Sequence, residues 1–101
     1  MTRQAIDGGG WFNPDAAQKF IEETRFDGRN RISVPTGSQW EHEALYCTRR
    51  GVYVLNSWSQ WQGSRERWTR VSTVRAADWL TANGYAAADT ATAHAQADAE
   101  V

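Results

Sequence analysis

The sequence predicts an α+β domain, in which a small antiparallel sheet of three or four strands with a central hairpin carries a helix near each end. A helical spacing of apolar residues follows Pro14, two β-rich runs lie on either side of Arg50-Gly51, and a second helical stretch ends at Gly84. The 101 residues suffice for one modest core, and therefore for a single domain.

The two ends of the chain are expected to lie outside that domain. Residues 1–12 contain Gly8-Gly9-Gly10 without the strand and helix that a dinucleotide-binding loop needs, so we expect a flexible leader. Residues 86–101 are half alanine with no large aliphatic residue before the last position, so we expect a disordered or frayed tail. Residues 13–85 then form the single α+β domain.

The first helix is predicted over residues 14–24. Asn13 is a favourable N-cap, and Pro14 suits the first helical position, where its missing N–H costs nothing. The residues that share one face at helical spacing are Ala17, Phe20, Ile21 and Thr24. Asp27-Gly28 has the turn chemistry that would end this helix.

Three strands are predicted in the middle of the chain. Residues 31–34 alternate as a brief strand, and residues 44–49 and 52–58 form the central hairpin. With Arg50-Gly51 as a two-residue turn, Cys47 would pair with Val54. Both faces of this hairpin hold apolar residues, so one face should lie under a helix and the other should be covered or offered to a partner.

A third meander strand and a last helix complete the prediction. Residues 67–72 alternate as a strand after the turn at 62–64, and residues 74–83 read as a helix capped by Ser72 or Thr73. Gly84 ends it as a left-handed C-cap residue, and Trp79 lies beside its apolar stripe, from where it can clamp the sheet.

The charges are unevenly distributed. From Arg25 to Arg75, nine arginines and four acidic residues give +5, whereas the remaining residues, with two basic and eight acidic side chains, give −6. This asymmetry favours an anionic partner or an acidic tail that screens a basic face. The alternative is that arginine is simply the solvated residue that this chain prefers.

The sequence gives indirect indications of the cellular compartment and of cofactor binding. No apolar run approaches the roughly 20 residues that cross a bilayer, and no signal segment is visible, so we expect a cytoplasmic protein. Cys47 is the single cysteine and sits in the middle of a strand, which indicates a buried, inert thiol rather than a nucleophile or zinc ligand. We expect no cofactor and no metal.

Tryptophan is the most informative residue type. Five of the six lie between Gln39 and Trp79, and the tripeptide Ser-Gln-Trp occurs twice, at 38–40 and 59–61. Tryptophan at this density indicates either an aromatic core or a recognition face. The second interpretation predicts partner-binding residues among the tryptophans and arginines around the hairpin and the loop after it: Arg49, Arg50, Trp58, Trp61, Arg65, Arg67, Trp68 and Arg70.

The same aromatic and arginine residues allow two other interpretations. Bases could stack on the indole rings while guanidinium groups hold phosphates, which is the chemistry of single-stranded nucleic acid binding. Alternatively Trp58, Trp61 and Trp68 could pack together across the second turn and simply stabilise a small sheet.

A polar set offers a third, distant function. It consists of Asp27, Asn30, Ser38, Glu41, His42 and Glu43. A small hydrolase could use His42 as a general base with Glu43 or Asp27 beside it. The spacing matches no metal motif, and a histidine between two glutamates is more typical of an ion-paired residue, so we expect neither catalysis nor metal binding here.

Four stretches of the chain have a distinctive sequence: 27–33, 36–43, 45–48 and, most specifically, Trp58-Ser-Gln-Trp-Gln-Gly-Ser64. They resemble a known family of small bacterial, plasmid and phage proteins that has no assigned activity, and the resemblance spans roughly residues 25–84. It implies a compact α+β domain carried on mobile or accessory DNA and contributes no catalytic residue.

Taken together, these features favour binding over catalysis. We expect a small, non-enzymatic accessory protein of phage or plasmid type, an inhibitor or regulator, that docks on a protein partner. Its oligomeric state is left open.

Overall fold

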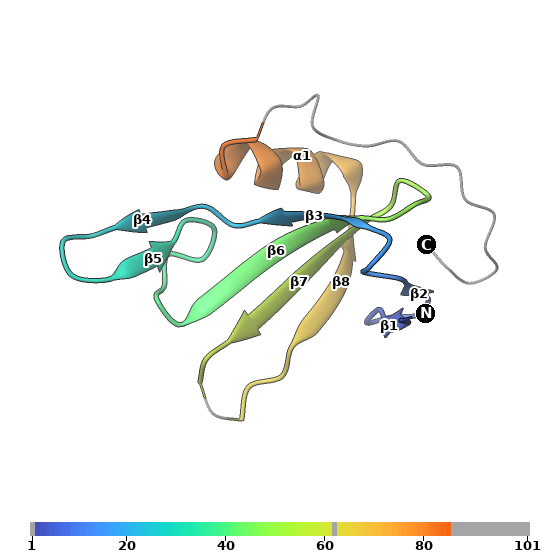
Figure 1. The fold of residues 1–101 in the computed structure, drawn as a ribbon, viewed down its shortest axis with the longest axis horizontal. Helices are drawn as coiled ribbons and strands as arrows, with labels where there is room; N and C mark the ends of the chain where they lie inside the picture. Colours follow the sequence, from blue (N-terminus) through green and yellow to red (C-terminus); the bar gives the residue numbers. More distant parts are fainter. Residues whose placement is uncertain (1, 62, 86–101) are drawn as a thin grey trace.

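The computed structural model, which describes residues 2–61 and 63–85, is mostly β (Figure 1). Within these residues there are eight strands in three sheets and one helix near the C-terminal end. The predicted α+β class with a helix near each end is therefore wrong, because no helix forms over residues 14–24. The expected tail, 86–101, lies outside the described residues.

The main sheet has four antiparallel strands, and its three later strands form the predicted meander. The fourth strand is contributed by the segment predicted as a helix. In spatial order they are β3 (Gln18–Ile21), β6 (Glu41–Cys47), β7 (Tyr53–Ser59) and β8 (Arg67–Val71).

The signals for the first helix act only locally. The side-chain oxygen of Asn13 accepts the N–H of Asp15, and the carbonyl of Asn13 accepts the N–H of Ala16, so a single turn forms and is not continued. Phe20, in β3, instead pairs with Leu45 of the neighbouring strand β6 and is buried. A helix of about 11 residues is marginal by itself, so strand pairing that buries this phenylalanine decides the conformation.

The central hairpin is present, but its register differs from the prediction by one residue. Cys47 pairs with Tyr53, not Val54. The N–H of Thr48 donates to the carbonyl of Val52 (2.8 Å), and Gly51 has φ of 80°. The loop therefore has three residues, 49–51, and ends in a glycine with left-handed backbone conformation. Three-residue loops of this kind are the next most common hairpin connection after the two-residue primed turns. One residue of slip changes which residues of β7 share a face with those of β6.

The last helix agrees with the prediction. In α1 (Thr73–Ala82), the Ser72 hydroxyl accepts the N–H of Arg75, and Gly84 beyond the C-cap has φ of 84°. This helix lies against one face of the main sheet (Figure 1). The buried core between them consists of Phe20, Leu45, Cys47, Tyr53, Ala76, Trp79 and Leu80.

The second face of the sheet is covered by the N-terminal segment. β1 (Gln4–Ala5) and β2 (Trp11–Phe12) pair with each other, and the N–H of Asp7 donates to the carbonyl of Trp68 on the outer edge of β8. Residues 4–12, expected as a leader outside the domain, thus contribute Ile6 and Phe12 to the core. Their buried partners are Ala44, Tyr46 and Val54.

The remaining two strands form a separate ribbon. β4 (Thr24–Phe26) pairs with β5 (Arg31–Ser33), and the ribbon extends from one end of the molecule (Figure 1). The predicted strand at 31–34 is present as β5, but it pairs outside the main sheet. Asp27 forms the ribbon turn, since its Oδ1 accepts the N–H groups of Arg29 and Asn30.

We expect the pKa of Asp27 to lie below the ordinary aspartate value, because the N–H groups of Asn30 and Arg29 hydrogen-bond its ionised carboxylate. The stabilisation from this turn is then present above the pKa of the unfolded chain and is lost as the pH falls through the lower, folded value. NMR titration of the carboxyl carbon, folded and in urea, measures both midpoints. Equal midpoints would contradict the role of this carboxylate in the turn.

Candidate functional site

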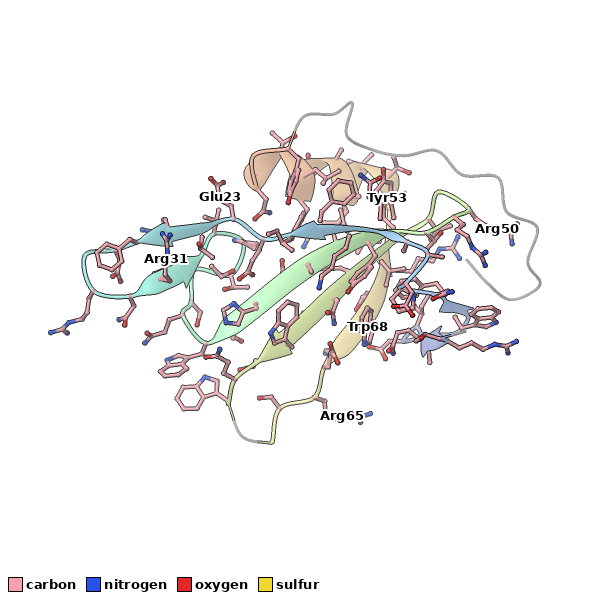
Figure 2. All side chains as sticks on the ribbon, viewed as in Figure 1. Glu23, Arg31, Arg50, Tyr53, Arg65 and Trp68 are labelled. Carbon is pink, nitrogen blue, oxygen red and sulfur yellow. The ribbon has the colours of Figure 1, made fainter. Side chains whose placement is uncertain are left out.

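The eight predicted partner-binding residues do not form one site. Arg49 and Arg50 are exposed in the β6–β7 turn, whereas Arg65 lies in the connection that follows the other end of β7. Figure 2 shows Arg50 and Arg65 at separate ends of the sheet. The hairpin arginines therefore cannot act with the loop arginines on one small ligand.

Two of the predicted tryptophans serve mainly in packing. The Trp68 ring lies 5.7 Å from that of Phe12 and 5.4 Å from that of Tyr46, on the face covered by the N-terminal segment. The Trp58 ring stacks on His42 at 5.7 Å with an interplanar angle of 29°. Both are only partly accessible.

Trp61 instead contacts Trp40, a residue outside the predicted set. Their ring centroids are 5.4 Å apart at 45°, and 61% and 42% of the two residues stay exposed. The Ser38 hydroxyl accepts the N–H of Trp40 (3.0 Å), and the Ser59 hydroxyl accepts that of Trp61 (3.1 Å). Both Ser-Gln-Trp tripeptides thus form the same turn, and we call Trp40 and Trp61 the tryptophan pair.

The two turns are joined at the open end of the β6–β7 hairpin. The N–H of Gln60 donates to the carbonyl of Trp40 (2.9 Å), one step beyond the last strand pair, Glu41 with Ser59. The repeat itself is the signal that could have found Trp40, since its copies lie at nearly equal distances on either side of the Arg50-Gly51 turn.

Beside this end of the hairpin lies an open cavity of about 340 Å³, which we call the polar hollow. The hollow lies on the same face of the sheet as α1, beyond the area that the helix covers. Glu43, Ser57 and Arg67 are cross-strand neighbours on this face. Its lining mixes carboxylate, guanidinium and hydroxyl groups: Thr36, Glu41, Glu43, Ser57, Trp58, Ser59, Ser64, Arg65 and Arg67. Such a surface can both donate and accept hydrogen bonds.

The arginines near the hollow are not locked in place. Arg67 has its Nε 3.8 Å from Asp7 Oδ2, and both side chains are more than half exposed, so this pair contributes little. Arg65 and Arg70 are also exposed, but Arg70 pairs with Val54 and so lies on the opposite face from the hollow. Only Arg65 and Arg67 of the predicted arginines line the hollow.

His42 belongs to a largely buried group of polar residues that the sequence does not reveal. Its Nδ1 lies 2.7 Å from Glu22 Oε2, while Glu22 Oε1 accepts the Ser33 hydroxyl and the Glu43 N–H, each at 2.7 Å. Only 10% of the Glu22 side chain and 18% of that of His42 are exposed. We call this arrangement the Glu22 clasp, because one carboxylate joins the end of β3 to β5 and β6.

The carboxylates predicted to assist His42 lie elsewhere. Glu43 Oε1 accepts the indole N–H of Trp79 (2.9 Å), and Asp27 sits in the ribbon turn. The Nε2 of His42 is buried and has no hydrogen-bond partner among the described residues. In the described ranges no group of three His, Cys, Asp or Glu side chains could hold a metal ion.

Comparison with family models, curated proteins and solved structures finds no match for this chain. The resemblance to small phage and plasmid proteins therefore stays an expectation. Among residues 2–61 and 63–85, no helix is long and apolar enough to cross a membrane.

Proposed function

We propose that this protein is a non-catalytic accessory module that docks on a protein partner through the tryptophan pair and the arginine-bearing rim of the polar hollow. The observation that carries the proposal is the contact between two exposed indole rings at the end of the hairpin. Tryptophan and arginine are the side chains most often found as interface anchors. An inhibitor or regulator of phage or plasmid type is the role that the sequence resemblance suggests.

The energetics of the tryptophan pair support docking. Roughly half of each residue is exposed, so covering both would remove on the order of 200 Å² of mostly apolar surface. This burial would contribute about 5 kcal/mol before the entropic costs of association are subtracted. The serine turns and the Gln60–Trp40 hydrogen bond fix the backbone at both tryptophans, and the contact between the two rings orients them before any partner arrives. A preorganised pair loses less conformational entropy on binding than two mobile side chains would.

The charges around the pair favour protein over nucleic acid. Glu41 and Glu43 line the same hollow as Arg65 and Arg67. Phosphate groups at this hollow would be repelled by the two carboxylates, whereas a protein surface can offer both donors and acceptors to them. Single-stranded nucleic acid binding by these residues is therefore the second candidate.

The test is a pair of alanine variants. We expect Trp40→Ala/Trp61→Ala to weaken binding to the partner by about 30-fold or more, as expected when an interface loses its anchor residues, with little change in the thermal midpoint. A cross-linked pull-down from the native host identifies the partner, and titration of the purified protein with the purified partner measures the Kd of their complex. Val74→Ala is the matched control, since this apolar residue is 72% exposed on α1.

Two results would contradict the proposal. One is partner binding that the double variant leaves unchanged. The other is single-stranded oligonucleotide binding by the wild-type protein that falls steeply with salt and is lost in the tryptophan double variant, because this would assign the pair to base stacking.

A further inference from the structure

The β4–β5 ribbon is an arm that extends from the main sheet and is mostly exposed. All three residues of β4 are exposed, and only Ile32 and Ser33, at the base of β5, are buried. The ribbon projects past the end of the main sheet, and Arg31 lies on it away from the sheet (Figure 2). Its shape therefore suits contact with an extended partner rather than with a small ligand.

The ribbon is basic. Residues 24–33 contain Arg25, Arg29 and Arg31 and a single acidic residue, Asp27, which gives a net charge of +2 over ten residues. All three arginines are exposed, and none forms a salt bridge with a described residue. The Asp27 Oδ1 accepts the backbone N–H groups of the turn, and its charge interacts with that of Arg25, so the ribbon keeps the net charge of +2.

An aromatic ring stands between these charges. Phe26 is 62% exposed and pairs with Arg31, so the two side chains lie on the same face of the ribbon. Phenylalanine has no polar group that would reward its exposure to water. Arg25 precedes Phe26 in β4 and pairs with Ile32, so it lies on the other face of the ribbon. An exposed ring beside a guanidinium group is an arrangement on which an unpaired base stacks while the arginine contacts a neighbouring phosphate.

We propose that the β4–β5 ribbon binds single-stranded nucleic acid that passes around its edge, with Phe26 stacked on a base, Arg31 on a phosphate at the same face, and Arg29 in the turn and Arg25 on the other face holding further phosphates. This surface shares no residue with the tryptophan pair or with the lining of the polar hollow. The acidic residues nearest to its arginines in the sequence are Asp27 in the turn and Glu23 directly before β4. A duplex offers phosphates but no unstacked base, so it would use the arginines alone and bind more weakly.

The test is fluorescence anisotropy with a labelled single strand of about 12 nucleotides, compared with a hairpin duplex of the same composition. For three phosphate contacts, log Kobs should fall against log salt with a slope of about −2 between about 50 and about 200 mM. In Arg25→Ala/Arg29→Ala/Arg31→Ala this slope should approach zero. Phe26→Ala should weaken binding by about tenfold, because a base loses its stacking surface.

The matched control is Arg65→Ala/Arg67→Ala/Arg70→Ala, which removes the same charge from β8 and the connection before it, at the edge of the main sheet opposite β3. It should retain most of the salt slope and change the affinity by less than about threefold. Equal losses in the two triple variants would overturn the proposal, as would undetectable binding at low salt or tighter binding of the duplex. Loss of oligonucleotide binding in Trp40→Ala/Trp61→Ala would instead contradict the proposed docking function.

Discussion

Replacing Phe12 with alanine should lower the free energy of unfolding by about 3–5 kcal/mol. Phe12 is fully buried, with its ring 5.5 Å from that of Tyr46 and 5.7 Å from that of Trp68. The variant leaves a cavity between the N-terminal segment and the sheet. Since domains of this size are stable by only about 5–15 kcal/mol, the loss is a large share of the total. Urea unfolding measures it.

Phe26→Ala is the matched control for this prediction, since it removes the same atoms from an exposed position in the ribbon. Its effect should stay within about 0.5 kcal/mol. If Phe12→Ala cost no more than Phe26→Ala, residues 4–12 would not be packed on the sheet, and the second face would be open.

Replacing Glu22 with alanine should destabilise the protein by about 3–5 kcal/mol, because three largely buried groups lose the carboxylate that they share. The substitution leaves the Ser33 hydroxyl, the Glu43 N–H and the His42 ring without their shared acceptor. Unsatisfied buried donors cost about 1–3 kcal/mol each. The unfolding midpoint in urea, together with the NMR signal of the Glu43 amide, reports on the loss.

Glu23→Ala is the control for the clasp. Glu23 is the next residue, is exposed, and donates its backbone N–H to Asn83 Oδ1, a contact that the substitution leaves in place. Glu22→Gln should have an intermediate effect, because one amide oxygen remains as an acceptor. Equal destabilisation by Glu22→Ala and Glu23→Ala would show that the clasp does not hold β3 and β5 on the sheet.

The tryptophan pair illustrates how far sequence reasoning reaches towards the candidate site. The Ser-Gln-Trp repeat is plain in the sequence, and so is the hairpin between its copies. Which tryptophan contacts which depends on the pairing of β6 with β7, and the prediction grouped Trp61 with Trp58 and Trp68 instead of with Trp40. The partner of Trp61 is thus a neighbour across the hairpin and not one of the nearest tryptophans in the sequence.

Glu22, in contrast to the tryptophan pair, has no local sequence signal that could have identified it as a functional or structural residue. It was predicted inside a helix, where its carboxylate would face solvent. Its three partners come from β5 and β6, 11 to 21 residues away. A contact of this kind exists only once the strands are in place, so the pairing of His42 with Glu22 rather than with Glu43 or Asp27 could not be read in advance.

The sequence by itself determined the elements whose stability is local. Helix α1 begins at a serine cap and ends before Gly84, and the β6–β7 hairpin turns around a glycine, because capping hydrogen bonds and left-handed glycines act within a few residues. Tertiary structure alone decided the strand at residues 18–21, the hairpin register and the cover of the second face. In each case a weak local preference lost to the burial of Phe20, Phe12 or the β7 side chains against residues far away in the chain.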